Sequence, residues 1–183
     1  MEFSVNMGPR HGTVTVDPTH GNELTTIFTF SANDWVDPED IDYPLLYGYT
    51  YLDGGQNQAV LQAPLDDNQL ETVLPYVNQG VVDVTMTCSD SLGTSTTAQK
   101  SIGLSLLKDQ ERAQAIQAEI EELEIADIDE IPGYISKLTS STELLTTDTI
   151  TSLVSAFDRY FDDIVEFDEN NLDTTIASHK LIT

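Results

Sequence analysis

Hydrophobic and polar residues alternate with a period of two along much of the first hundred residues. The alternation is clearest from Val82 to Cys88, where every second residue would lie on one face of a strand. Clusters of Gly, Pro, Asn and Asp separate the alternating segments. The pattern predicts seven strands, at residues 13–16, 24–31, 45–52, 59–62, 70–74, 82–88 and 96–104. Seven short strands with no helix between them predict a mainly β, immunoglobulin-like antiparallel sandwich.

Large side chains mark the inward faces of these strands. We expect Leu24, Thr26, Phe28 and Phe30 to share one face of the second strand, and Tyr47, Tyr49 and Tyr51 to share one face of the third. Aromatic rows at this spacing are typical of a sandwich core, although exposed rings, with Trp35, would instead stack on sugars. The predicted core contains Phe28, Phe30, Tyr49, Val82, Val84 and Met86, and Cys88 has the same parity as the last three.

The hydrophobic period changes near Leu106, and the remaining residues repeat with helical spacing. We therefore divide the chain into a sandwich at residues 1–106 and a small acidic helical unit at residues 107–183. Three helices are predicted, at approximately 108–125, 131–140 and 148–165. The first would bury Ala113, Ile116, Ile120 and Leu123, and the second Ile131, Ile135 and Leu138.

The third predicted helix has the widest apolar face. Its main interface residues are Ile150, Leu153, Phe157 and Phe161, continued by Val154 and Ile164. Six such side chains represent roughly 9 to 18 kcal/mol of burial as an upper bound, which is too much to leave in water. We expect this face to contact protein: the rest of the chain, an adjoining domain or an identical copy.

The chain is strongly acidic, with 32 Asp and Glu against 7 Lys and Arg and a formal net charge of −25. This charge excludes nucleic acid as a partner, because phosphate must be neutralised by basic side chains. It also disfavours an anionic membrane surface, so a membrane would be reached only through other parts of a longer chain. No pair of carboxylates and no activated nucleophile stands out, and we expect no enzyme activity.

One acidic loop is a candidate metal site. Asp34, Asp37, Glu39, Asp40 and Asp42 follow one another closely between two predicted strands. Calcium takes six to eight oxygen ligands, and clustered carboxylates in a loop supply several of them. We consider Asp37, Glu39, Asp40 and Asp42 candidate calcium ligands, and a solvated Asp-Pro turn is the alternative. No other cofactor is expected.

Two stretches within residues 10–106 resemble the polycystic kidney disease (PKD) domain and the related receptor-for-egg-jelly (REJ) repeats. The segment at residues 47–54, Tyr-Gly-Tyr-Thr-Tyr-Leu-Asp-Gly, is similar to the aromatic strand that ends in Gly-Asp-Gly in PKD domains. The segment at residues 82–93 is similar to the alternating Val/Thr strand that runs into Asp-x-x-Gly. Upstream, residues 18–38 look like the opening of an egg-jelly-type repeat.

The resemblance implies a non-enzymatic structural or adhesive module, from a larger cell-surface or ciliary protein of the polycystin-like or protist kind. It implies an extracellular location. Two alternatives stay open: a subunit of a self-assembling extracellular filament, and a module that binds glycan or calcium.

Overall fold

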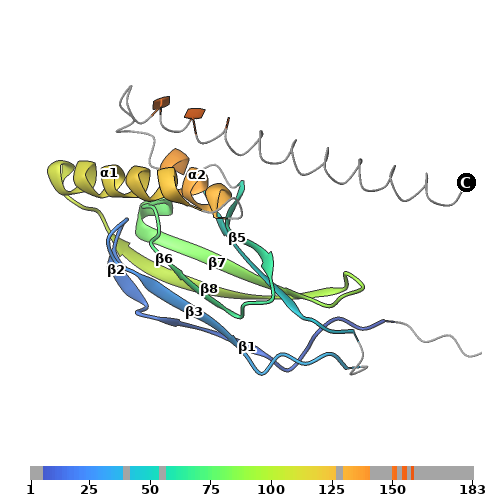
Figure 1. Cartoon of the computed structure of the whole chain (residues 1–183). Helices are drawn as coiled ribbons and strands as arrows, with labels where there is room; N and C mark the ends of the chain where they lie inside the picture. Colours follow the sequence, from blue (N-terminus) through green and yellow to red (C-terminus); the bar gives the residue numbers. More distant parts are fainter. Residues whose placement is uncertain are drawn as a thin grey trace, which may run out of the picture.

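The computed structural model describes residues 6–38, 42–53, 57–126 and 130–140, together with residues 150, 151, 154, 155 and 158 of a further helical segment. Within these residues the chain forms a two-sheet β-sandwich followed by two helices that lie along one side of it (Figure 1). The mainly β, antiparallel sandwich and the helical unit after it are as predicted.

The two sheets divide the strands unequally. The smaller sheet has the order β1-β3-β6, formed by β1 (Thr13–Asp17), β3 (Phe28–Asn33) and β6 (Gln69–Thr72). The larger sheet has the order β2-β8-β7-β4-β5. Its strands are β2 (His20–Asn22), β4 (Leu46–Leu52), β5 (Gln58–Leu65), β7 (Val81–Ser89) and β8 (Ser95–Ser105), and a short 3-10 turn η1 (Asn78–Gly80) precedes β7.

All strand pairs are antiparallel except the pair of β2 with β8. Strand β2 was missed by the sequence analysis because its three residues, His-Gly-Asn, show no hydrophobic alternation. The chain passes from β1 in one sheet to β2 in the other, and β2 then runs parallel to the last strand, β8.

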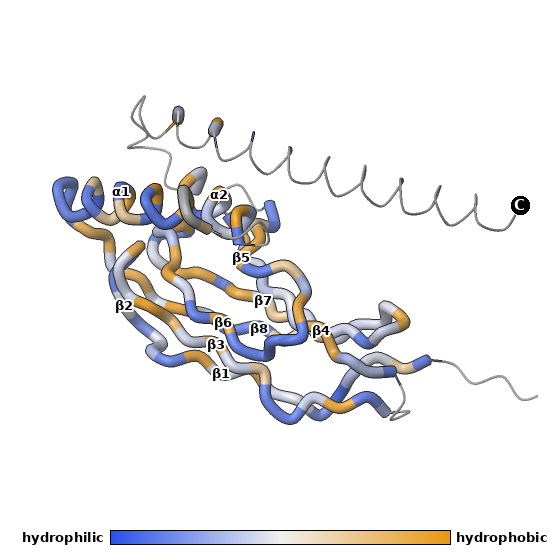
Figure 2. The backbone as a smooth tube through the Cα atoms, in the orientation of Figure 1, coloured by the Kyte–Doolittle hydropathy of each residue, from blue (hydrophilic) through white to orange (hydrophobic). Residues whose placement is uncertain are grey.

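The core between the sheets contains the residues that period-two alternation placed there. Phe28, Phe30, Tyr49, Val82, Val84 and Met86 are all buried. The rings of Phe30 and Tyr49 meet across the two sheets with centroids 5.8 Å apart. Tyr47, Tyr51, Trp35 and Cys88 belong to the same buried cluster, so the aromatic rows form the core and are not an exposed sugar-binding surface. In Figure 2 the hydrophobic segments, in orange, lie along the strands of the sandwich.

The helices α1 (Asp109–Ile125) and α2 (Ile131–Ser140) form a second hydrophobic cluster against one edge of the sandwich. Helix α2 approaches β5 so closely that a Cβ on Gly133 would lie 2.5 Å from the carbonyl oxygen of Leu61. The hydroxyl of Tyr51 donates to the carbonyl of Ser136 at 2.9 Å and lies 2.6 Å from the hydroxyl of Ser140. A residue from the sandwich core is therefore bonded to α2.

The structure corrects two details of the predicted elements. The strand expected at residues 24–31 begins only at Phe28, because Leu24 has a positive φ of 53° and lies in a turn. Leu24 is buried, but it packs in the helical cluster instead of the sandwich core. In α1, Ala113 is exposed and Ala115 is buried in its place.

Candidate functional site: an acidic groove beside strand β6

The two sheets expose different edges on the side of the molecule where the helices lie. Strand β5 ends the larger sheet, and its outer side is covered by α2. Strand β6 ends the smaller sheet and pairs only with β3. An uncovered edge strand presents main-chain donors and acceptors that a further strand can bond. Of the two edges, β6 is therefore the one open to a partner.

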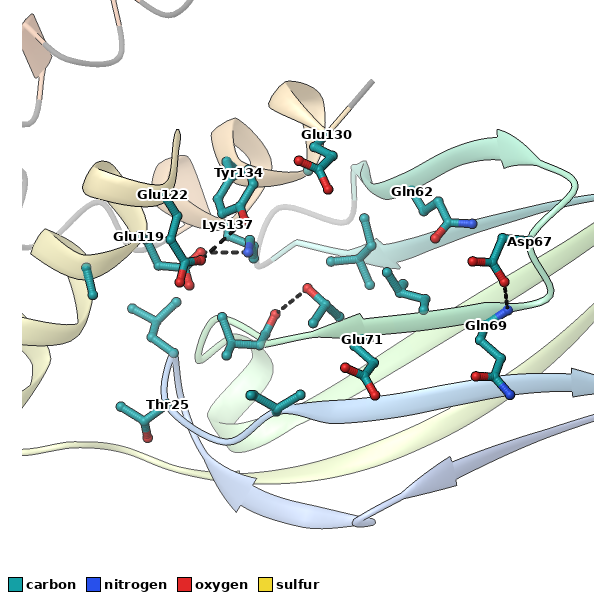
Figure 3. Close-up of a pocket in the computed structure, with 18 of the residues that line it drawn as sticks. Thr25, Gln62, Asp67, Gln69, Glu71, Glu119, Glu122, Glu130, Tyr134 and Lys137 are labelled. Carbon is teal, nitrogen blue, oxygen red and sulfur yellow. Dashed lines mark hydrogen bonds and ion pairs between the residues drawn. The ribbon is translucent and has the colours of Figure 1, made fainter. Parts of the chain in front are cut away.

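A groove of about 770 Å³ lies between β6 and the helices. Its floor contains apolar side chains, of which Ile27 and Leu65 are exposed. Figure 3 shows Glu119, Glu122, Tyr134 and Lys137 of the helices on one side and residues of β6 on the other. The lining of the groove thus combines apolar and polar side chains.

The walls of the groove are strongly acidic. Its lining contains five carboxylates, contributed by both sides, and a single basic residue, Lys137. Lys137 is 2.6 Å from Glu119 and so neutralises one of the five. The carboxylates are Asp67, Glu71, Glu119, Glu122 and Glu130. The groove therefore attracts cationic groups and repels anionic ones.

The ion pair at the end of the groove is itself buried. Glu119 and Lys137 are 5% and 6% exposed. Burial raises the pKa of Glu119, and the charge of Lys137 opposes that shift. The ammonium group also lies 4.1 Å from the ring centroid of Tyr134, a cation–π contact. Lys137 is thus held by two partners from the groove wall.

Tyr134 points its hydroxyl toward the acidic wall. The hydroxyl donates to Glu122 at 3.2 Å. Burial, followed by the charges of Glu122 and Glu119, raises the pKa of Tyr134. The phenol is therefore neutral at physiological pH and serves as a hydrogen-bond donor with an apolar ring.

A family model, the REJ domain, matches residues 1–137. The chain belongs to the REJ family. The match includes the sandwich, α1 and most of α2, and so extends beyond residues 10–106, where the sequence resemblance was seen. The predicted boundary at residue 106 stays a prediction.

Solved structures of low identity also match this REJ chain. The PKD1 domain of Vibrio anguillarum Epp is 14% identical, with 56% of this chain and 100% of that chain covered and a TM-score of 0.34. CopC from Methylosinus trichosporium OB3b is 13% identical, with 54% and 98% covered and a TM-score of 0.35. A comparison with curated proteins found no match.

Two of the predicted calcium ligands, Asp37 and Asp42, lie at the other end of the sandwich, before β4. Asp37 is buried, and Asp42 is half-buried. Burial, followed by the charges of Asp37 and Asp90, raises the pKa of Asp42. Glu39 and Asp40 lie outside the described residues. Within the described part of the chain, no three His, Cys, Asp or Glu side chains are grouped to hold a metal.

Asp90 is the first residue of the Asp-x-x-Gly segment at residues 90–93, in the turn next to this loop. One carboxylate oxygen accepts the main-chain N–H groups of Leu92 and Thr94, both at 2.9 Å, and so closes the turn between β7 and β8. The other accepts the side-chain amide of Asn6 at 3.0 Å. The calcium site at Asp37, Glu39, Asp40 and Asp42 stays a prediction.

The predicted interface on the third helix is only partly described. Ile150 and Val154 are exposed, at 50% and 53%. Leu153, Phe157 and Phe161 lie outside the described side chains, so the partner of this face stays a prediction. No helix in the described ranges is both long and apolar enough to span a membrane.

Two buried ion pairs between distant segments were missed by the sequence analysis. Glu23 is fully buried, and one carboxylate oxygen lies 3.3 Å from Nε of Arg112 in α1. The same oxygen accepts the main-chain N–H of Leu107 at 3.0 Å. The second pair is Glu119 with Lys137. The sequence did contain one signal for these pairs. Arg112 lies four residues before Ile116, and Glu119 lies three residues after it, so helical periodicity places both on the buried face of α1.

Proposed function

We propose that this REJ chain is a non-enzymatic structural module of an extracellular, polycystin-like protein, built to hold its fold when its two ends are pulled apart. Membership of a family of non-catalytic modules, which are typically extracellular, supports the first part of the proposal. The parallel pairing of β2 with β8 supports the second part.

The direction of the two strands decides how a pulling force acts on them. Strand β2 lies near the beginning of the module, and β8 is its last strand. Because the strands are parallel, tension from the two ends pulls β2 and β8 in opposite directions along their length. Their hydrogen bonds, including Gly103 N–H to Thr19 O and Glu23 N–H to Ser105 O, both 3.1 Å, are then loaded together and not one after another.

The helices must stay attached for this force to reach β8. The carboxylate of Glu23, directly after β2, accepts the N–H of Leu107, just beyond β8, and forms an ion pair with Arg112 in α1. This carboxylate therefore ties the end of β2 to the start of α1. We infer that the sandwich and the two helices bear load as one unit.

Single-molecule pulling tests the proposal. The full chain is held once through residues 6 and 140, and once through residues 81 and 140. Because Val81 pairs with Gly103, the second geometry pulls antiparallel β7 and β8 apart from the same end, one bond at a time. We expect a clearly higher unfolding force in the first geometry. Equal forces in both geometries, or a lower force in the first, would contradict a load-bearing role.

A further inference from the structure

The main-chain groups on the open side of β6 are arranged to accept another strand. In an antiparallel pair, successive residues direct their N–H and C=O groups alternately toward and away from the partner strand. The bond from Ala32 N–H to Asn68 O, 2.9 Å, sets the phase of the pair formed by β3 and β6. This phase directs the main chain of Leu70 and Thr72 toward β3 and the main chain of Glu71 toward the groove.

The groove beside this edge has the dimensions of a short extended peptide. Strand β6 has four residues, and an extended chain rises roughly 3.4 Å per residue, so its edge is about 14 Å long. The adjoining volume is about 770 Å³. Apolar side chains line its floor, while Glu71 on β6 and Glu122 on α1 stand on opposite walls (Figure 3).

Charge selects the kind of peptide that fits. The single basic residue of the lining, Lys137, is paired with Glu119, so Asp67, Glu71 and Glu122 have no basic residue of the lining within ion-pair distance. A strand added at β6 would alternate its side chains between the apolar floor and the acidic walls. Lysine or arginine at every second position would complement those walls.

The acidic walls of the groove disfavour binding of another segment or copy of this chain. A second copy carries a net charge of −25. The segment after residue 140 has nine Asp and Glu against two Lys and Arg. Like charges placed across an interface oppose association. The occupant is therefore a basic segment of a different protein or domain.

We propose that the groove beside β6 binds an extended, basic peptide segment, which adds to the smaller sheet as a fourth strand. The main chain of Glu71 bonds the added strand, and the acidic walls bind its alternate basic side chains. This interaction goes beyond the load-bearing role, which does not depend on it.

A blocked synthetic peptide, acetyl-Lys-Val-Lys-Thr-Lys-Val-amide, is the probe, and calorimetric titration of the full chain measures its affinity. Two peptides are controls: one with Glu in place of each Lys, and one with the main-chain nitrogens of alternate residues methylated. We expect binding of the first peptide, weakening as salt screens the charges, and neither control should bind comparably. Absence of binding by the lysine peptide, or equal binding of the methylated one, would overturn the proposal.

Variants of the chain separate strand addition from charge alone. The substitution Glu71→Pro removes an N–H that points away from β3, and an edge strand tolerates proline at such a position. We expect it to weaken peptide binding about tenfold, from the lost hydrogen bond and the obstructing ring. Glu71→Gln keeps the N–H and should weaken binding less. Equal affinities of the two variants would overturn strand addition; unfolding by urea shows that each is folded.

A matched pair of double variants tests the location. Glu71→Gln with Glu122→Gln removes two charges from the groove, and Glu111→Gln with Glu121→Gln removes two exposed charges from α1 that do not line it. The first pair should weaken binding roughly two- to thirtyfold, as two solvent-exposed ion pairs imply. Equal affinities for the two double variants would show general attraction to an acidic chain and would overturn the groove as the site.

Discussion

The buried carboxylate of Glu23 provides the most direct test of how the helices are held to the sandwich. It is fully buried, and it serves both Arg112 and the N–H of Leu107. Arg112 is 8% exposed. The substitution Glu23→Ala would leave its guanidinium group without an ion-pair partner and the N–H of Leu107 without an acceptor. Both consequences destabilise the folded state, because a buried charge or donor has lost its solvation by water.

The expected loss is large relative to the stability of a domain. Removing one partner of a buried ion pair costs about 3–5 kcal/mol, and an orphaned buried N–H costs about 1–3 kcal/mol. The two losses share one carboxylate and do not add fully, so we expect Glu23→Ala to lower the free energy of unfolding by about 3–5 kcal/mol. Total stabilities are about 5–15 kcal/mol, so this variant approaches the limit of folding.

Urea unfolding followed by two signals measures the effect. Trp35 is the only tryptophan in the chain and reports on the sandwich core, while far-ultraviolet circular dichroism reports on the helices. In the unsubstituted chain both transitions should coincide, as expected of one cooperative unit. In Glu23→Ala both midpoints should fall, with the helical signal falling at least as far.

Two further variants make the result specific. Glu71→Ala removes an exposed acid from β6 and should change stability by less than about 0.5 kcal/mol. Arg112→Met, combined with Glu23→Ala, should recover part of the loss, because no uncompensated charge remains. A loss below about 1 kcal/mol in Glu23→Ala, or no recovery in the double variant, would refute the role assigned to this pair.

Four other outcomes are expected. Val84→Asp should unfold the chain, because Val84 is 2% exposed in β7 and an unpaired buried carboxylate costs several kcal/mol; unchanged melting would contradict the register of the core. Burial raises the pKa of the Cys88 thiol to about 11, so at pH 8 a thiol reagent should react far more slowly with the native chain than with the urea-unfolded chain, and equal rates would disprove burial. The raised pKa of Asp42 means that ionisation of this carboxyl group disfavours the folded state. Asp42→Asn should therefore raise the melting temperature at pH 7, and this gain should shrink as the pH falls toward 4. If calcium binds this loop, a chelator should lower the melting temperature of the unsubstituted chain but not that of the variant. If the face bearing Phe157 and Phe161 contacts another copy, association in sedimentation should strengthen with salt, and a monomer at both low and high salt would exclude that contact.

The sandwich core and the bounds of both described helices could be predicted from the sequence because both depend on local periodicity. Alternation from Val82 to Cys88 assigns side chains to the inner face of a strand without knowledge of its neighbours. Spacing by three and four predicted helices at 108–125 and 131–140, and the structure has Asp109–Ile125 and Ile131–Ser140. Segments without periodicity, such as β2, gave no such signal.

The groove and the buried ion pairs required the tertiary structure, because their parts are distant in the sequence. Glu23 and Leu107, which are hydrogen-bonded, are 84 residues apart in the sequence, and Tyr51 and Ser136 are 85 residues apart. Composition predicted an acidic surface, but not that carboxylates of β6 and α1 would stand on opposite sides of an open strand edge. A charge pattern records which groups are present, whereas a binding surface depends on the distances between them, and those distances are set only when the helices pack against the sheet.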